Sequence, residues 1–426
     1  MIRKLIFMLT CLPLSLGAAE ILSWEKVVEI SYQSNAELSG ADANLKASEY
    51  QKKAIRGDFL PKIFGTMGYV NQKIETRTTN FFNSNNNNNG DSWSASLNGS
   101  LNLFNGLRDY SRLTQAEANI ELLNRRYITT KARISYDLKA AFESLQYATN
   151  YQVLTEEIIK RRQENLKIVE LRFDSGLENK GSVLLSNAYL AQARYDALQA
   201  TNAEATSRAQ LSKAMGIDEY SEFGISGSVP LYNPPTLVKE DLQELAKSTP
   251  EFLEAYAQEK VSEKNIGIAE ANFMPTLDLT GSIRKIGTEY FPEDSKQSTW
   301  GLTLNIPIFD GGKDYYGRKA AIETFTAVKM NRLNVNRVLV ATLQQKYAAF
   351  MESVIKLETD SLFKDAAETR AKIARSKYNN GLLAFENWDI IESDLINRQK
   401  AYLQSRRDRV FAQASWEQTL GKGIDL

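Results

Sequence analysis

The stretch WSASLNGSLNLFNG, residues 93–106, alternates between apolar or small side chains and polar side chains from Trp93 to Leu103. A period of two is typical of a β-strand with one apolar and one polar face. The stretch WGLTLNIPIFDGG, residues 300–312, has the same alternation. The first stretch ends in Phe104-Asn105-Gly106, and the second has Phe309-Asp310-Gly311 at the corresponding place. We therefore expect strands at about 92–104 and 298–309.

A weaker alternation precedes each of these strands and predicts their partners at about 62–72 and 276–286. Strands of about ten residues, with tryptophan near their ends and an uncharged polar face, are typical of an outer-membrane barrel. The alternative is a half-buried sheet in a soluble protein. In a barrel, the polar face of the 276–286 strand would line the lumen with Asp278, Thr280, Ser282 and Arg284.

Four strands are too few to close such a barrel, because the smallest closed transmembrane barrels have about eight. Two copies of the chain would supply about eight strands and three copies about twelve, and only the larger number leaves an interior wider than packed side chains. We therefore expect the chain to oligomerise.

Long helices are expected at about 107–174 and 313–379, since neither stretch contains proline. At 1.5 Å per residue, each would be on the order of 100 Å long. A coiled-coil seam is indicated in the first helix by apolar residues spaced alternately by four and three: Ile134, Leu138, Ala141, Leu145 and Ala148. Return helices are expected at about 182–215 and 384–420. A ring of helices is favoured over a soluble bundle.

The sequence contains an internal repeat. Phe59-Leu60-Pro61 recurs as Phe273-Met274-Pro275, and Asn35-Ala36 corresponds loosely to Thr249-Pro250, both at an offset of 214 residues. Phe104-Asn105-Gly106 recurs as Phe309-Asp310-Gly311 at an offset of 205. We expect a first repeat over 20–215, a linker over 216–236, and a second repeat over 237–426, each opening with a helix.

The N-terminus has the features of a secretory signal peptide over residues 1–19. Arg3 and Lys4 precede an apolar run too short to span a bilayer, and the small residues Gly17, Ala18 and Ala19 follow it.

The chain has no histidine, which excludes imidazole catalysis and histidine-bound metals. Its 52 basic and 52 acidic residues give no indication of a nucleic-acid partner. We expect an exported protein without catalytic residues, metals or other cofactors.

These features together resemble the TolC family of outer-membrane efflux proteins. The resemblance rests on the doubled halves, the Phe-Leu-Pro and Phe-Met-Pro turns, LNIPIFDGG at 304–312 and YNNG at 378–381. It implies a mixed α and β fold with two structural repeats per chain. The implied assembly is a trimeric 12-stranded outer-membrane β-barrel, four strands per chain, continued by a long periplasmic α-helical coiled-coil barrel, in a Gram-negative bacterium.

The resemblance implies an exit duct that passively conducts substrates from a periplasmic adaptor (membrane fusion) protein and an inner-membrane pump of the RND, ABC or MFS class to the exterior. The expected contacts are a homotrimer, the adaptor, the pump and outer-membrane lipid, with no nucleic acid. A type I protein secretion duct and a barrel-anchored structural coiled-coil trimer without transport are the alternatives. An enzyme is least favoured, because Ser182 and Ser186 lie near Lys180 but no motif places a base.

The family's fold implies that the tips of the two helical hairpins meet the adaptor and form the periplasmic constriction. The turns are expected at 176–181 and 380–385, where glycine permits a tight reversal. We expect the adaptor to contact Gly176, Leu177, Gly381 and Leu382.

The second tip also holds the candidate gate. Tyr378 stands three residues before Gly381, as in the family, but Leu383 occupies the position where some members have an arginine, so an arginine latch is not expected. Glu386, Asp389 and Glu392 follow at three-residue spacing, on roughly one face of the helix. In a trimer they would form rings of negative charge, so we expect a cation-selective gate. The alternative is a solvated helix face or a stabilising role near the helix N-terminus.

Overall fold

The structure is a computed structural model that describes residues 20–74, 88–217 and 223–423. The expected signal peptide lies outside the described residues. The chain forms two compact units, each assembled from separate stretches. One unit comprises residues up to Ser39 together with 129–242 and 341–426, and the other comprises 40–128 and 243–340.

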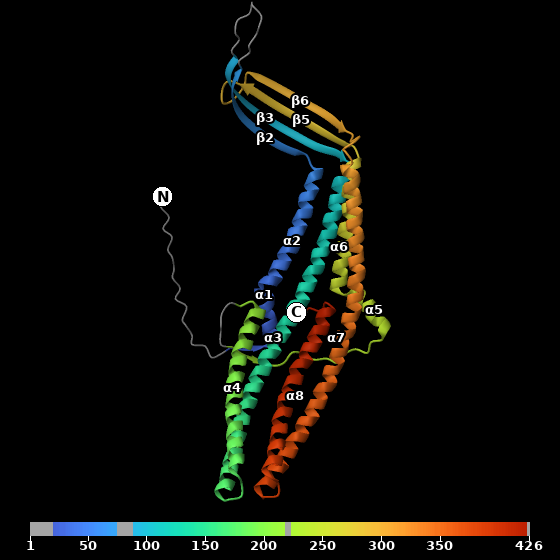
Figure 1. Ribbon diagram of the computed structural model, residues 1–426. Coiled ribbons are helices and arrows are strands. Elements are labelled where there is room, and N and C mark those ends of the chain that lie inside the picture. Colours follow the sequence, from blue (N-terminus) through green and yellow to red (C-terminus); the bar gives the residue numbers. More distant parts are fainter. Residues whose placement is uncertain (1–19, 75–87, 218–222, 424–426) are drawn as a thin grey trace, which may run out of the picture. The chain divides into compact units, whose positions relative to one another are not determined.

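The second unit contains an antiparallel sheet of four strands (Figure 1): β2 (Lys62–Ile74), β3 (Asn88–Asn105), β5 (Thr276–Gly287) and β6 (Ser295–Asn305). Their order is β2-β3-β5-β6, so the central pairing joins the two halves of the chain. The expectation that the last strand continues to 309 is wrong, since β6 ends at Asn305. Pro307 has no N–H to donate to a neighbouring strand, which stops the ladder.

The strand register separates the side chains onto two faces. Trp93 pairs with Tyr69, Leu97 with Ile283, and Leu279 with Leu302, and these pairs form an exposed apolar face. The other face pairs hydroxyl and amide side chains, such as Asn98 with Ser282 and Ser100 with Thr280. A shift in register between Asn102 and Phe104 marks a β-bulge where β3 approaches its helix. The alternation in the sequence therefore predicts the apolar and polar faces of the sheet correctly.

A glycine makes the turn from β3 into the first long helix. Gly106 has a φ of +67°, and a Cβ there would lie 2.5 Å from Cβ of Met274 and 2.7 Å from the carbonyl oxygen of Ala271. The turn packs against the segment that leads into β5, which includes the 3₁₀ helix η2 (Ala271–Phe273). η1 (Gly57–Phe59) precedes β2 in the same way. Glycine is required at residue 106 both by φ and by close approach.

Two long helices follow the strands: α3 (Arg108–Asp174) and α7 (Lys313–Asn379), each of 67 residues. The first unit contains the later part of each, from Thr129 and from Ala341, and the helices that return from them, α4 (Lys180–Met215) and α8 (Phe385–Thr419). All five seam residues of α3, from Ile134 to Ala148, are buried. The four-three spacing therefore predicts the packed face of this helix correctly.

The initial helix of each half is broken in two at corresponding positions. α1 (Trp24–Ser34) gives way to α2 (Ala36–Arg56), and α5 (Lys239–Ser248) to α6 (Pro250–Glu270). Asn35 Oδ1 accepts hydrogen bonds from the amides of Glu37 and Leu38, and Thr249 Oγ1 accepts one from the amide of Phe252. Both residues therefore act as helix N-caps.

The expected linker contains a strand that the sequence did not predict. β4 (Phe223–Ser226) pairs in parallel with β1 (Glu20–Ser23). Leu22 and Phe223 join a core with Trp24, Phe142 and Leu211 in the first unit. Residues after β4 are fastened to α8, since Gln413 Nε2 donates to the carbonyl of Pro230 at 2.9 Å. The linker is thus part of the packed unit.

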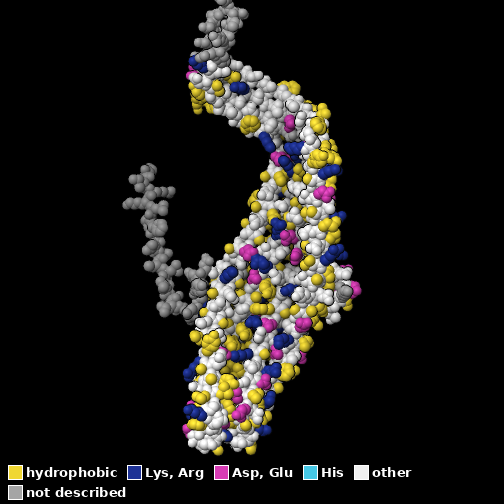
Figure 2. Space-filling model, in the orientation of Figure 1, with side chains coloured by type: hydrophobic (Ala, Val, Ile, Leu, Met, Phe, Trp, Pro, Cys, Tyr) yellow, Lys and Arg dark blue, Asp and Glu magenta, His cyan; other side chains and the backbone are white. Residues whose placement is uncertain are grey.

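Charge is distributed unevenly over the surface. Figure 2 shows few charged side chains over the strands, whereas Lys, Arg, Asp and Glu are interspersed along the helices. Among the described residues, no helix combines the length and the apolar character that a membrane span requires.

Candidate functional site

The hairpin turns end their first helices with the same hydrogen bonds. The amide of Leu177 donates to the carbonyl of Arg172 at 2.8 Å, and that of Leu382 to the carbonyl of Lys377 at 2.9 Å. This is the Schellman arrangement, in which Gly176 and Gly381 take positive φ. A Cβ on either glycine would meet nothing within 4 Å, so the turn needs their backbone conformation only. Leu177 and Leu382 are exposed.

Tyr378 is the centre of a packed cluster at the end of α7. Its ring is fully buried and stacks on Trp388 of α8, with centroids 4.2 Å apart and planes at 13°. Its hydroxyl donates to Glu178 Oε2 at 3.0 Å. Arg172 lies over the same ring and donates to the carbonyl of Tyr378 at 3.0 Å. Tyr378 thereby joins α7 to α8, to the end of α3 and to the turn before α4.

The tyrosine hydroxyl remains protonated in this setting. Burial and the hydrogen bond to Glu178 raise the pKa of the Tyr378 phenol above its usual value, against the opposing effect of Arg172. The phenol is therefore a hydrogen-bond donor throughout the physiological pH range.

A second set of contacts joins α3 to α8 farther from the hairpin turns than this cluster. Arg162 donates to Asp389 Oδ1 at 3.2 Å and to Ser393 Oγ at 3.1 Å, and its guanidinium lies over the ring of Tyr189. Arg161 contacts Glu392 at 3.5 Å. Asp389 and Glu392 are therefore paired with arginines of the same chain.

Glu392 is the most enclosed of these carboxylates. Its side chain is 1% exposed, and Asn165 Nδ2 donates to its Oε2 at 3.4 Å. Its Oε1 has no hydrogen-bond partner in the described structure. Arg375 of α7 also donates to Asn165, at 2.6 Å, and to Glu164 at 3.0 Å. The polar network thus links α3 to both helices of the second hairpin.

These contacts correct the expectation of three carboxylates on one helix face. Glu386 is exposed, whereas Glu392 is buried and Asp389 is only slightly exposed. Each step of three residues rotates the side chain by about 60° around an α-helix, so the first and third carboxylates point about 120° apart. Of the three, only Glu386 presents an unpaired carboxylate in this protomer.

The arginines and Asn165 were missed at the sequence level, although a signal was present. The buried face of α3 continues beyond Ala148 with Thr155, Ile158, Arg162, Asn165 and Val169. The last four are spaced by four, three and four, like the apolar seam before them. A charged residue at a seam position indicates a buried partner of opposite charge.

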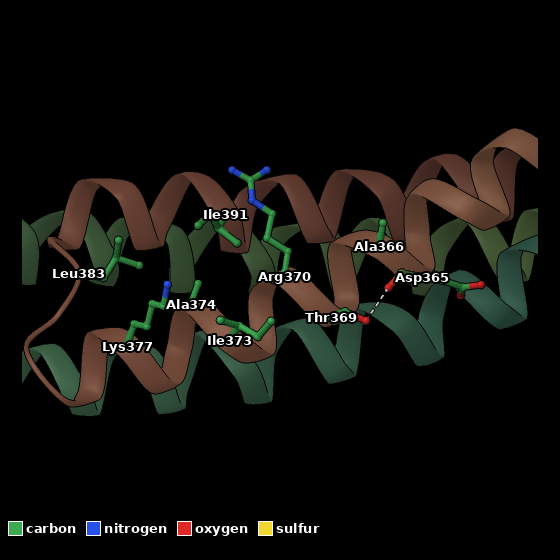
Figure 3. A pocket seen from close by; sticks show the side chains of 9 residues that line it. All are labelled: Asp365, Ala366, Thr369, Arg370, Ile373, Ala374, Lys377, Leu383 and Ile391. Carbon is green, nitrogen blue, oxygen red and sulfur yellow. Dashed lines mark hydrogen bonds between the residues drawn. The ribbon is translucent and has the colours of Figure 1, made fainter.

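A groove lies between α7 and α8 near the second tip, with a volume of about 670 Å³ (Figure 3). Leu383 and Ile391 line it opposite Ile373, Ala374 and Lys377 of α7. Leu383 also packs against the cluster around Tyr378. The aliphatic side chain of Leu383 therefore contributes to the packing of this tip.

The expected lumen residues share one face of the sheet. In β5, Asp278 pairs with Asn102, Thr280 with Ser100, Ser282 with Asn98 and Arg284 with Ser96. Asn102 Nδ2 donates to Asp278 Oδ1 at 2.8 Å. No acidic residue of the described chain contacts Arg284.

Solved structures of other proteins share this fold. The CmeC outer membrane channel of Campylobacter jejuni aligns with a TM-score of 0.82 and 15% identity, covering 94% of this chain and 86% of that one. The open state of the MtrE outer membrane channel of Neisseria gonorrhoeae aligns with a TM-score of 0.78 and 18% identity, covering 96% and 94%. The fold is thus that of outer-membrane channels.

Sequence comparisons agree with the fold. Outer membrane protein TolC of Escherichia coli (strain K12) is 22% identical over 449 residues, covering 98% of this chain and 86% of TolC. Probable outer membrane lipoprotein SilC of Salmonella typhimurium is 24% identical over 312 residues, covering 67% of this chain and 63% of SilC, less than two thirds of that relative. Residues 27–217 and 242–422 match the family model for outer membrane efflux proteins. The chain belongs to the outer membrane efflux protein family, which confirms the resemblance found in the sequence.

Proposed function

We propose that this chain is the outer-membrane exit duct of a tripartite efflux system and passively conducts substrates delivered by a periplasmic adaptor and an inner-membrane pump. The sheet is the observation that carries the proposal. It has an exposed apolar face, in which Trp300 is 83% and Leu302 58% exposed, and a polar face of hydroxyl and amide groups. Such a sheet suits a barrel wall that separates lipid from water.

The edges of the sheet support assembly of three copies. β2 and β6 are the edge strands, and three successive antiparallel pairings make them run in opposite directions. β6 of one copy can therefore pair with β2 of the next in antiparallel fashion. Three copies would close a barrel of 12 strands and leave no exposed edge. We infer a homotrimer with outer-membrane lipid against its apolar face.

The helices would form the periplasmic part of the duct. α3 and α7 have 67 residues each and would be on the order of 100 Å long if straight. The matched lengths, the two stretches that fit the family model, and the N-caps at Asn35 and Thr249 support two structural repeats per chain. Six long helices from three copies, with their return helices, would surround a lumen as a coiled-coil barrel.

The second hairpin would act as the periplasmic gate. Tyr378, Asp389 and Glu392 hold α7 and α8 to α3 within one protomer, and Tyr378 also binds Glu178 in the turn after α3. Movement of this hairpin away from the axis requires these bonds to break or to exchange partners. Glu386 remains available to face the lumen, while Gly176, Leu177, Gly381 and Leu382 form the turns that the adaptor would contact.

The test is the mass and conductance of the protein extracted from outer membranes in detergent. We expect a particle of three chains that forms ion-conducting channels in planar bilayers. A trimer without conductance would instead support a structural coiled-coil protein, and a monomer without channels would overturn the proposal. Loss of the chain should also sensitise cells to toxic compounds; a defect confined to protein export would support a type I secretion duct.

A further inference from the structure

The polar face of the sheet carries very little charge. In the described strands, the ionisable side chains on this face are Lys62, Asp278 and Arg284, and the other members are mostly Ser, Thr, Asn, Gln and Gly. Lys62 is neutralised by Asp58, whose Oδ1 lies 3.0 Å from its Nζ. Asp278 accepts a hydrogen bond from the uncharged amide of Asn102 and keeps its negative charge. Arg284 is thus the one charge on this face that lacks a bonded partner among the described residues.

The neighbours of Arg284 are set by the register and are uncharged. Ser96 of β3 and Gln297 of β6 stand directly opposite it, on either side. β5 is an interior strand, so both neighbouring strands come from the same chain. Assembly of further copies therefore adds no strand beside Arg284.

The other charge on the face is too distant to pair with it. Asp278 precedes Arg284 by six residues in β5, which corresponds to about 20 Å along an extended strand. Arg284 is also exposed, so its guanidinium can be reached from the solvent on this face. An unpaired guanidinium among hydroxyl and amide groups attracts anions and repels cations.

Two of the three carboxylates expected to select cations, Asp389 and Glu392, are paired with Arg162 and Arg161, while Glu386 is exposed. Ion pairing within the chain therefore removes most of the negative charge that was expected to oppose an anion-attracting arginine.

We propose that Arg284 forms an anion-attracting collar inside the barrel and contributes to the charge selectivity of the duct. The proposal rests on the proposed function, because three copies of the polar face must enclose the lumen. The ligands are solutes that carry carboxylate, phosphate or sulfonate groups, and chloride among inorganic ions. Three guanidiniums in a water-filled passage raise the local concentration of such anions, an effect that added salt screens.

The test compares two adjacent residues of β5 that lie on opposite faces. Arg284→Gln removes the charge from the polar face and introduces the side chain already present at Gln297. Lys285→Gln removes a positive charge one residue later, from the apolar face, where Lys285 stands opposite Ala95 and Lys296 and its Nζ lies 3.4 Å from Glu293 Oε1. The measurement is the chloride-to-potassium permeability ratio, obtained from reversal potentials of single channels in a potassium chloride gradient.

We expect Arg284→Gln to lower this ratio at least about twofold, with a larger effect at 0.1 M than at 1 M salt, and Lys285→Gln to leave it unchanged. An unchanged ratio in Arg284→Gln channels of normal conductance would overturn the collar while leaving the duct intact. Equal shifts in the two variants would also overturn it, because they would indicate a surface-charge effect. Absence of channels from the unaltered protein would instead contradict the proposed function.

Discussion

Tyr378 shows how one side chain connects several elements. Its ring packs in the aromatic cluster with Trp388 and Phe385, and its hydroxyl reaches Glu178 in the other hairpin. The ring contributes burial, while the hydroxyl contributes a directed bond to a charged acceptor. These two contributions can be separated by experiment.

Tyr378→Phe should keep the ring packing and lose the bond to Glu178. We expect a destabilisation of about 1–2 kcal/mol in the contact between the hairpins. Amides around the turn at 380–384 should exchange with deuterium several-fold faster, and channels should open more often. Tyr195→Phe is the control, because the hydroxyl of Tyr195 accepts only from Gln199 of its own helix. Equal exchange in the two variants would contradict a role for the Tyr378 hydroxyl in holding the two hairpins together.

Glu143 on α3 predicts a pH dependence of stability. The side chain is 4% exposed, and burial raises the pKa of its carboxyl from 4.5 to about 7, against the opposing effects of Arg406 and Arg407. The folded chain thus holds this proton more tightly than the unfolded chain. The resulting stabilisation is complete below about pH 4.5 and is lost as pH rises through 7.

Glu143→Gln should remove this dependence. We expect the variant to unfold at a higher temperature than the unaltered protein at pH 8 and at a similar temperature at pH 4.5, as measured by circular dichroism. The exposed Glu156→Gln on the same helix is the matched control and should change neither value. A melting difference that is the same at both pH values would exclude Glu143 as the titrating group.

At the scale of elements, the junctions between strand and long helix illustrate which features repeat and which do not. Gly106 and Gly311 occupy corresponding positions in the two halves, with φ of +67° and +75°. A Cβ at 106 would collide with Met274 and Ala271, whereas one at 311 would meet nothing within 4 Å. Another segment of the unit therefore occupies the space for a Cβ at residue 106 but not at residue 311.

Alanine substitution should separate the cost of a positive φ, which both glycines have, from the cost of the close contact, which only Gly106 makes. Gly311→Ala should cost about 1–2 kcal/mol for the left-handed backbone alone. Gly106→Ala should cost that amount plus about 1–3 kcal/mol for overpacking. Thermal unfolding and the yield of folded protein in the outer membrane are the measurements. Equal losses from the two variants would show that the contact with Met274 relaxes without cost.

The seam of α3 shows which features of a packed helix face can be predicted from residue spacing. Four-three spacing identifies the buried residues from Ile134 to Ala148 because apolar side chains select the packed face directly. The same spacing continues through Arg162 and Asn165, but their partners on α7 and α8 lie more than 200 residues away in the chain. Periodicity identifies such a face, whereas the identity of the partner depends on tertiary packing.

At the scale of the whole molecule, the two faces of the sheet determine how the chain can be placed in a membrane. Leu302 and Thr303 are adjacent in β6 but pair with Leu279 and Asp278, on opposite faces. An arginine on the lipid face of a barrel costs about 2–4 kcal/mol near the bilayer midplane, whereas the lumen tolerates it.

Leu302→Arg should therefore strongly reduce the amount of the proposed trimer in the outer membrane, while Thr303→Arg should assemble normally. The amounts can be compared by unheated gel electrophoresis of outer-membrane fractions. Thr303 faces Asp278, so an arginine there also gains an acidic neighbour. Normal assembly of Leu302→Arg would contradict the assignment of the apolar face to lipid.

The sequence by itself determined the alternating strands, the length of the long helices, the glycine turns and the family, because each depends on local periodicity, backbone conformation or residue order. Only the tertiary structure decided that β3 pairs with β5, that β1 pairs with β4, that Tyr378 is buried, and that Arg161 and Arg162 neutralise two of the candidate gate carboxylates. Spacing places a charge on a helix or strand. Its effect depends on whether folding brings an opposite charge beside it, as at Asp389, or leaves it unpaired, as at Arg284.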